Sequence, residues 1–291
     1  MTTRTLALCA DDFGQSPGIS AGIARLARAG RLNAVSCITN SPHWEAQAER
    51  LRGLPETVDI GLHLNLTEGR PLSARLARRW PTLPALPTLI ARAHLRLLPT
   101  SELRNEVHAQ LRAFINALGV APRFIDGHQH VHHLPGLRES ILDMLEHVQP
   151  LPAMRSTAHV LGPGFAFKRW VIAHTGGQAL QTLLAQRVIA HNPALLGVYD
   201  FKANDYGALM RRWLAELPPV GGLLFCHPGE GRPGAADEPP DAIRAARARE
   251  FAYLDSAEFI ADLREADVVL GRVWQTRPEG RLVSSRRSRL D

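Results

Sequence analysis

RFIDGHQHVHH, residues 123–133, is the stretch on which the interpretation of this chain depends. Its apolar start is typical of a buried strand, and it runs into an aspartate and four histidines. In an extended segment, alternate side chains point to the same side, so Asp126, His128, His130 and His132 are expected to share one face. Imidazoles with this spacing suit a first-row divalent metal ion, and a polar loop whose histidines have no special role is the simpler alternative.

The same arrangement, an apolar strand that ends in polar residues, recurs along the chain. It is found at ADDFG (10–14), GLHLNLT (61–67), IDGHQHVHH (125–133), MRS (154–156) and FCHPGE (225–230). Amphipathic stretches between the strands predict helices, so the strands are expected to pair in parallel. Active sites of βα barrels gather at the carboxyl ends of the strands. We therefore expect an α/β fold, an irregular (β/α) barrel of about seven parallel strands, in preference to an open sheet.

The length of 291 residues fits one such barrel, which typically has about 250 residues, and we expect residues 1–280 to form a single domain. Five prolines interrupt residues 70–100. We interpret this segment as a lid or excursion that carries one short helix, Leu89–Leu97. Residues 281–291 contain four arginines and are expected to form a disordered basic tail.

Composition argues against several classes of protein. Hydrophobic residues make up 45% of the chain and charged residues 21%, as in globular rather than disordered proteins. The formal net charge is +6, but the basic residues are spread out and form no run interleaved with aromatic side chains, so no nucleic-acid partner is expected. Cys9, Cys37 and Cys226 have no metal-ligand spacing and are expected to be buried free thiols.

The sequence also predicts where the protein works. The N-terminal MTTRTLALCADDFG has no signal-peptide pattern, and no window reaches the ~18 uninterrupted apolar residues of a membrane-spanning helix. We therefore expect a cytoplasmic protein. The arginines of residues 281–291 leave peripheral contact with the anionic inner membrane surface as an alternative to a frayed tail. The oligomeric state is not readable from the sequence.

Taken singly, His63 and His227 resemble core or turn histidines, and one of the two adjacent aspartates resembles a helix cap. Taken together, Asp11, Asp12, His63 and His128 would form a site of carboxylates and imidazoles that leaves positions open on a metal ion. Such a site lowers the pKa of bound water and polarises a carbonyl, while a spare carboxylate and a separate histidine act as base and acid. This combination suits hydrolysis of an amide or ester.

The four motifs ADDFG, GLHLNLT, IDGHQHVH and CHP, in this order across residues 5–275, closely resemble the YdjC/ChbG-like carbohydrate deacetylase family. The resemblance implies an irregular βα barrel related to polysaccharide deacetylases and glycoside hydrolases. It also implies removal of an acetyl group from an N-acetylated sugar with the help of one divalent metal ion. By position, it makes Asp12, His63 and His128 the metal ligands, Asp11 the general base, and His227 the acid that protonates the leaving amine.

The resemblance extends to residues around this centre. Arg155, in MRS, is similar to the family's arginine beside the base, which it would hold ionised. Asp126 is expected to orient a liganding histidine. His130, His132 and Asn65 are expected to line the substrate or to support the ligands from behind. Zinc or magnesium is the first expectation for the metal, with cobalt, nickel and manganese as alternatives, because two imidazoles and one carboxylate accept all of them.

The proline-rich segment and GVYDF (197–201) resemble the hopanoid-biosynthesis-associated, HpnK-like subgroup, which implies an N-acetylglucosaminyl group on a hopanoid polyol as substrate. Two other functions stay open at this stage. One is a metal-dependent amidohydrolase or phosphoesterase that acts on a non-sugar substrate, although those barrels usually carry their His-x-His on the first strand. The other is a metal- or carbohydrate-binding barrel without catalysis, against which the occupied catalytic positions argue.

Overall fold

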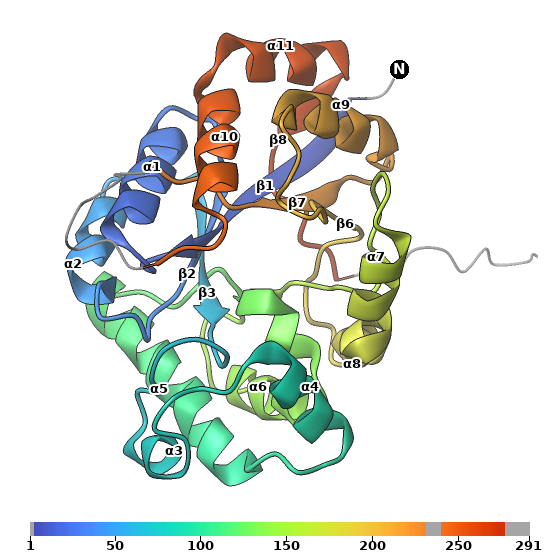
Figure 1. Cartoon of the computed structure of the whole chain (residues 1–291). Coiled ribbons are helices and arrows are strands. Elements are labelled where there is room, and N and C mark those ends of the chain that lie inside the picture. Colours follow the sequence, from blue (N-terminus) through green and yellow to red (C-terminus); the bar gives the residue numbers. More distant parts are fainter. Residues whose placement is uncertain (1–2, 231–239, 277–291) are drawn as a thin grey trace, which may run out of the picture.

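A curled parallel sheet forms the centre of the computed structural model, which describes residues 3–230 and 240–276 (Figure 1). Seven strands follow one another in the order β5-β4-β3-β2-β1-β7-β6, and an eighth, β8, pairs with β1. The strands are β1 (Arg4–Phe13), β2 (Ala34–Cys37), β3 (Asp59–Leu64), β4 (Phe124–Gly127), β5 (Ala153–Met154), β6 (Leu195–Leu196), β7 (Gly222–Cys226) and β8 (Val268–Leu270).

Helices connect the strands and cover the outer face of the sheet (Figure 1). They are α1 (Pro17–Arg28), α2 (Trp44–Ala48), α3 (Ala74–Arg79), α4 (Leu86–His94), α5 (Thr100–Leu118), α6 (Leu137–Leu145), α7 (Ala166–Ile172), α8 (Gln178–Gln186), α9 (Tyr206–Glu216), α10 (Arg244–Asp255) and α11 (Ala257–Glu265). Shorter turns are η1 (Glu49–Leu51), η2 (His128–His133) and η3 (Ala173–Gly177).

The central strand β1 organises the sheet. On one side it pairs with β7 over Leu6–Ala10, and on the other side with β8 and then with β2. Between the outer strands β5 and β6 lie single parallel bridges, Met154 to His191 and Val160 to Leu195, rather than a continuous ladder. The predicted fold class, an irregular parallel (β/α) barrel of about seven strands, is confirmed, and the sheet curls into a half-barrel.

Alternation along β1 divides the core into two layers. Leu6 and Leu8 point outward into the large cluster shared with the helices. Ala7 and Cys9 point to the inside of the curled sheet, where Phe225 also packs. Because side chains of a strand alternate, every second residue of β1 faces the inside of the curled sheet. The polar residues at the strand ends lie at one end of this interior.

Local sequence signals account for the first helix. The Ser16 hydroxyl accepts a hydrogen bond of 3.3 Å from the Ile19 backbone N–H, and Pro17 occupies the first helical turn. Ile19, Ile23 and Leu26 then form a buried stripe at helical spacing against the sheet. Ser16 as the cap, Pro17 at the first helical position and Gly30 just past the end predict a helix here, and the structure confirms it.

The segment 70–100 differs from the prediction. It contains two short helices, α3 and α4, instead of the single helix Leu89–Leu97, which was wrong. Pro87 sits in the first turn of α4, where its missing N–H costs nothing, so the proline opens a helix rather than preventing one. Leu76, Trp80 and Leu89 form a separate small core with Val131 of η2. The segment therefore packs directly on the histidine-rich turn.

Two further elements, β6 and α10, escaped the prediction. The sequence pattern also predicts a helix over Ala179–His191, whereas α8 runs from Gln178 to Gln186. The three cysteines are buried and free. Within residues 3–230 and 240–276, no helix combines the length and the apolar composition needed to cross a membrane. The basic tail expected at residues 281–291 lies outside the described residues.

Candidate metal centre and active site

The carboxyl ends of five strands bring the predicted catalytic and metal-binding side chains to one edge of the sheet. These side chains are Asp11 and Asp12 at the end of β1, His63 on β3, His128 directly after β4, Arg155 directly after β5, and His227 directly after β7. Five of the six are buried, and His227 is partly exposed. The sequence motifs therefore meet at the carboxyl edge of the sheet, where they were expected.

The adjacent aspartates reach the same site because β1 is irregular at its end. Asp11 continues the inward alternation of Cys9, whose Sγ lies 3.5 Å from the Asp11 carboxylate. Asp12 has a φ of +69°, and the register of β1 with β2 shifts between Ala10 and Phe13. A left-handed backbone at a residue other than glycine is unfavourable and clusters at functional sites, and here it turns the second carboxylate toward the histidines.

Within the described residues, Asp12, His63 and His128 form one of two groups of candidate ligands, and the other, Cys9, Asp11 and Asp126, has its two carboxylates taken by Arg155. Oδ1 of Asp12 lies 2.9 Å from Nδ1 of His128 and 3.5 Å from Nε2 of His63. One ligand atom from each residue falls within 4.8 Å of the other two. Donors bound to one tetrahedral ion at about 2.0–2.2 Å are about 3.4 Å apart, so this oxygen and the two nitrogens fit a divalent ion of the zinc type.

The second oxygen of Asp12 is occupied by an arginine that the sequence analysis did not foresee. Arg247, on α10, places Nη2 2.8 Å from Asp12 Oδ2 and 3.0 Å from Gln15 Oε1. Burial works against the charge of Asp12, but Arg247 and His128 outweigh it and hold the pKa of this carboxyl well below its usual range. Only Oδ1 of Asp12 is left to face the histidines.

Arg155 holds a second pair of carboxylates behind the triad. Its guanidinium donates to both oxygens of Asp11, at 2.8 and 2.6 Å, and lies 2.5 Å from Oδ2 of Asp126. Asp126 in turn accepts a hydrogen bond of 2.6 Å from Nδ1 of His63 and one of 2.5 Å from the Ser36 hydroxyl. Asp126 thus holds Nδ1 of His63, which leaves Nε2 on the side of Asp12.

The neighbouring carboxylates set the charge of the two candidate ligand histidines. Burial alone lowers the pKa of His63, but Asp126 and Asp11 together with hydrogen bonds raise it to about 10. The pKa of His128 is raised to about 9 against the effect of burial by Asp12 and by Glu68, whose Oε1 lies 3.1 Å from Nε2. In the metal-free protein both rings are therefore imidazolium at neutral pH.

The other histidines of the cluster do not point where the sequence pattern predicted. The chain leaves the extended conformation after Gly127 and forms η2, with Gln129 and His130 at φ +53° and +60°. The expectation that His128, His130 and His132 share one face of an extended segment was therefore wrong. Only His128 joins the candidate triad.

His130, His132 and His133 nevertheless stay buried near the site. Nε2 of His132 bonds the Arg155 carbonyl at 2.9 Å, and His133 contacts the hydroxyls of Thr157 and Thr175 at 2.8 and 3.0 Å. Burial lowers the pKa of His132 to about 4 and keeps the other two neutral as well. His132 and His133 therefore tie the turn to the segment after β5 and to η3, while the ring of His130 lies edge to face against Phe225 at 5.1 Å.

His227 stands apart from the triad between aromatic walls. Its ring centroid lies 5.2 Å from that of Phe201 and 5.6 Å from that of Phe225, both edge to face. Burial lowers the pKa of His227 to about 4, and its Nδ1 has no hydrogen-bond partner among the described residues. The ring is therefore neutral at pH 7 and available for a hydrogen bond to a bound molecule.

Helix α10 supports His227 through its main chain. The carboxylate of Glu250 accepts a hydrogen bond of 2.5 Å from the His227 backbone N–H and another from the Tyr199 hydroxyl, while Arg247 donates to the His227 carbonyl at 3.4 Å. Burial raises the pKa of Glu250 to about 7, although both hydrogen bonds oppose this. Sequence reasoning missed Arg247 and Glu250, and their one signal, a spacing of three in a run rich in Ala and Arg, is weak.

Asn65 lies one layer behind the site. Its amide donates to Asn40 Oδ1 at 3.0 Å and to the Glu68 carbonyl at 2.9 Å, while its oxygen accepts from the N–H groups of Thr67 and Glu68, both at 3.1 Å. These bonds fix the loop that carries Glu68 to His128. Of the two roles expected for Asn65, the geometry favours support over contact with substrate.

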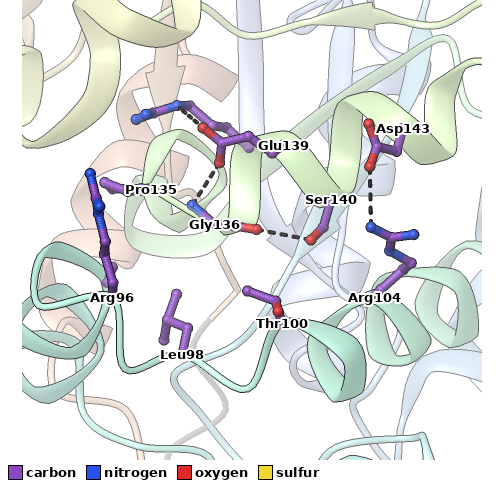
Figure 2. Close-up of a pocket in the computed structure, with 11 residues that line it drawn as sticks. Arg96, Leu98, Thr100, Arg104, Pro135, Gly136, Glu139, Ser140 and Asp143 are labelled. Atoms are coloured by element: carbon purple, nitrogen blue, oxygen red, sulfur yellow. Dashed lines mark hydrogen bonds and ion pairs between the residues drawn. The ribbon is translucent and has the colours of Figure 1, made fainter.

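A cavity of about 490 Å³ opens elsewhere, between the α4–α5 connection and the start of α6 (Figure 2). Among the described residues, all of its charged groups except Arg96 have partners: Arg104 lies 3.3 Å from Asp143 and Arg138 lies 2.8 Å from Glu139, and Glu139 also accepts a 2.6 Å hydrogen bond from the Gly136 N–H (Figure 2). The candidate ligands do not line it. We therefore assign the chemistry to the strand ends and not to this cavity.

Comparison with known proteins agrees with the motifs. A family model described as YdjC-like protein matches residues 5–265. A carbohydrate deacetylase of Mus musculus is 34% identical over 263 residues, which cover 82% of this chain and 83% of the mouse protein. A chitooligosaccharide deacetylase of Proteus mirabilis is 35% identical over 130 residues, 42% of this chain and 48% of that protein.

The extent of these matches varies. The chain spans about half the length of several curated relatives that it matches, for example 47% of a Xenopus laevis carbohydrate deacetylase. A crystal structure from Enterococcus faecalis, provisionally described as a cellobiose-phosphate cleavage protein, has a TM-score of 0.72 over 94% of this chain and 98% of that one. At 20% identity it supports the fold alone. The family model covers most of the sequence, and the chain belongs to the YdjC-like protein family.

Proposed function

We propose that this protein is a metal-dependent hydrolase that removes the acetyl group from an N-acetylated sugar. The observation that carries the proposal is the placement of Asp11 directly before Asp12, in a site where Asp12, His63 and His128 offer three donors to one ion. The names of the curated relatives, carbohydrate and chitooligosaccharide deacetylases, supply the substrate class. As expected for this chemistry, the site provides a carboxylate that is not needed as a ligand.

A divalent ion held by the triad would lower the pKa of a water molecule and polarise the acetyl carbonyl. The remaining chemistry falls to the chain's own side chains. Asp11 accepts the proton of the attacking water, and Arg155 keeps its carboxylate in one orientation through two charge-assisted hydrogen bonds. The same guanidinium also pairs with Asp126, which holds His63, so Arg155 links the base Asp11 to the carboxylate that positions a ligand.

His227 is the proposed proton donor to the leaving amine. Burial lowers the pKa of His227, so the ring is neutral before the reaction. The proton that Asp11 takes from the attacking water is relayed to His227 as negative charge develops in the bound substrate. The imidazolium then gives it to the nitrogen as the C–N bond breaks, which returns Asp11 and His227 to their starting states. The rings of Phe201 and Phe225 contact the His227 imidazole edge to face and restrict its orientation, and Glu250 of α10 binds its backbone N–H. Residues 70–100, which pack on η2, are proposed to act as a lid over the sugar.

Acetate release from chitobiose and from an N-acetylglucosaminyl hopanoid, followed side by side by mass spectrometry, tests the reaction and the sugar carrier together. Asp11→Asn is expected to retain metal and to lose turnover by about 10²–10⁴-fold, the usual contribution of a general base. Asp143→Asn, which changes an exposed acid on α6, is the matched control. Activity confined to cyclic imides or phosphoesters, or full activity of Asp11→Asn, contradicts the proposal.

A further inference from the structure

Two segments that surround the candidate site leave large apolar side chains in solvent. On the turn after α4, Leu95 and Leu97 are 67% and 63% exposed. On α7, Phe167 and Trp170 are 77% and 55% exposed. We call these four residues the rim patch. Helix α7 buries no residue of its own, and among the described residues the exposed aromatic side chains all belong to residues 165–170.

The two halves of the rim patch lie on the same face of the barrel as the catalytic residues. The segment with Leu95 follows β3, and α7 follows β5, so both leave the sheet at the carboxyl ends of strands (Figure 1). Nε2 of His94 contacts the Thr175 carbonyl at 3.1 Å, and the ring of His174 stacks on Trp170 at 4.5 Å. The Thr175 hydroxyl in turn contacts His133 of the histidine turn at 3.0 Å.

Charge is distributed unevenly around this rim. Residues 69–101, which include α3 and α4, contain six arginines and none of the chain's 28 acidic residues. Residues 147–199, which include α7 and α8, also contain no aspartate or glutamate. Arg96, between the two exposed leucines, is one of the residues that line the cavity in Figure 2, and the arginines at 70, 75, 78 and 79 are exposed as well. The rim therefore attracts an anionic partner.

We propose that the rim patch and its arginines dock the protein on the surface of an anionic phospholipid bilayer, with the carboxyl edge of the barrel toward the lipid. Exposed aromatic and leucine side chains beside arginines, on segments that carry no acidic residue of their own, are the composition of surfaces that lie in the headgroup region of membranes. The docking orients the candidate site toward a sugar carried by a lipid. In this respect it extends the proposed function, but the docking itself requires no catalysis.

Single-stranded nucleic acid is the other partner that basic and aromatic residues suggest, and the geometry disfavours it. Bases bind by stacking on free aromatic faces. Trp170 already lies between Phe167, with ring centroids 6.2 Å apart and planes 15° apart, and His174 at 4.5 Å. The edges of these rings, and the exposed leucines, are suited to the boundary between headgroups and acyl chains.

Cosedimentation with vesicles tests the docking. The full-length protein is expected to sediment with vesicles of mixed phosphatidylglycerol and phosphatidylcholine and to be released from them by high salt. With vesicles that contain only phosphatidylcholine, the protein is expected to stay in the supernatant. Phe167→Ser/Trp170→Ser is expected to weaken binding about tenfold or more, because it removes two large side chains from the contact. Arg96→Gln is expected to weaken it about fivefold. Val120→Ser, an exposed apolar change in the loop before β4, serves as the control and is expected to bind like the wild type.

A second measurement locates the contact. Trp170 is the exposed tryptophan, whereas Trp44, Trp80 and Trp213 are buried and Trp274 is partly buried. Brominated lipids in the vesicles are therefore expected to quench the fluorescence of the wild type and not that of Trp170→Phe. The proposal would be overturned if the double-serine variant bound vesicles as well as the wild type, or if brominated lipids did not quench the wild type. It would also be overturned if the wild type were retained more strongly on a single-stranded oligonucleotide than on vesicles, or if it sedimented as a dimer that the variant dissociates. Acetate release from soluble chitobiose is expected to be unchanged in the double variant, so failure here is separable from failure of the proposed function.

Discussion

Replacing Arg155 by methionine is the sharpest test of how the site is held together. The guanidinium is fully buried and lies within hydrogen-bond distance of two carboxylates, Asp11 and Asp126. Methionine approximates the length of the side chain but removes the charge and every donor. Arg155→Met therefore leaves two buried carboxylates without their shared counter-ion, while the packing of the stem is largely kept.

The size of the expected effect follows from the burial. Removing one partner of a buried ion pair costs about 3–5 kcal/mol, because the remaining charge is left uncompensated. In a chain of this length, about 2–3 °C of melting temperature corresponds to each kcal/mol, so the midpoint is expected to fall by roughly 6–15 °C. Adding Asp11→Asn to Arg155→Met removes one of the stranded charges, so the double variant is expected to recover part of this loss.

Thermal unfolding of metal-stripped protein measures both variants, with Arg104→Met as the control. Arg104 pairs with Asp143 at 3.3 Å on the surface, where both side chains are about half exposed, and such a pair contributes ~0–1 kcal/mol. The pKa of Asp126 is lowered despite burial, chiefly by Arg155 and His63, so its contribution to stability is present at neutral pH and is lost on acidification. Arg155→Met lacks this contribution at every pH, so the difference in melting temperature between the variant and the wild type is expected to become smaller at low pH. Equal melting of Arg155→Met and Arg104→Met, or a gap that widens in acid, would refute the reasoning.

Three further predictions concern the ligands and α10. His128→Ala is expected to lose the metal in elemental analysis, whereas His130→Ala is expected to keep it and to change turnover; equal metal content in both would contradict the assignment. The pKa values of His63 and His128 are raised to about 10 and 9, so a metal that binds at pH 7 must displace a proton from each ring. Calorimetry in buffers of different ionisation enthalpy is therefore expected to show the release of about two protons. The affinity for the metal is expected to rise as pH rises. The pKa of Glu250 is raised from 4.5 to about 7 in the folded protein, so stability is lost as pH rises from about 4.5 to about 7 and levels off above that. Glu250→Gln is therefore expected to be more stable than the wild type at pH 8, by up to about 3 kcal/mol, and similar at pH 5. A variant less stable at both pH values would show that the carboxylate is needed.

The parallel sheet was predictable because its main strands are continuous apolar runs that end in polar residues. β1, β3 and β7 carry this pattern in full, and the alternation along β1 already selects Asp11 for the interior. β6 has only two residues, Leu195 and Leu196, and is held by pairing with β7 rather than by a pattern of its own. A strand that short carries no periodicity to detect.

The histidine cluster shows where a period of two stops being informative. His128, His130 and His132 share one face only if the chain stays extended, and two consecutive residues with positive φ end that condition. The turn is stabilised from outside, by Val131 in the small core under residues 70–100 and by the contacts of His133 with Thr157 and Thr175. Those partners lie far away in the sequence, so tertiary packing decided the geometry against the local pattern.

Helix α10 was overlooked because its buried face is not apolar. The residues that it buries are Ala246, Arg247, Glu250, Tyr253 and Leu254. They have helical spacing, but two of the five are charged, so the hydrophobic stripe that marks an amphipathic helix is broken. Its charged residues are buried because they meet the carboxylate of Asp12 and the main chain of His227, partners that exist only in the folded barrel.

The charge of the site explains why a second arginine is needed there. Asp11, Asp12 and Asp126 bring three carboxylates into a buried space, and buried carboxylates without partners are costly. Arg155 offsets one charge of the inner pair, and Arg247 offsets the charge of Asp12. One negative charge of the three remains, and Glu68, 3.1 Å from His128, adds a second. Two protons on the histidines, or a divalent ion that displaces both of them, balance these two charges. The exchange of metal for two protons therefore leaves the net charge of the site unchanged, so the buried carboxylates keep their counter-charge with and without the ion.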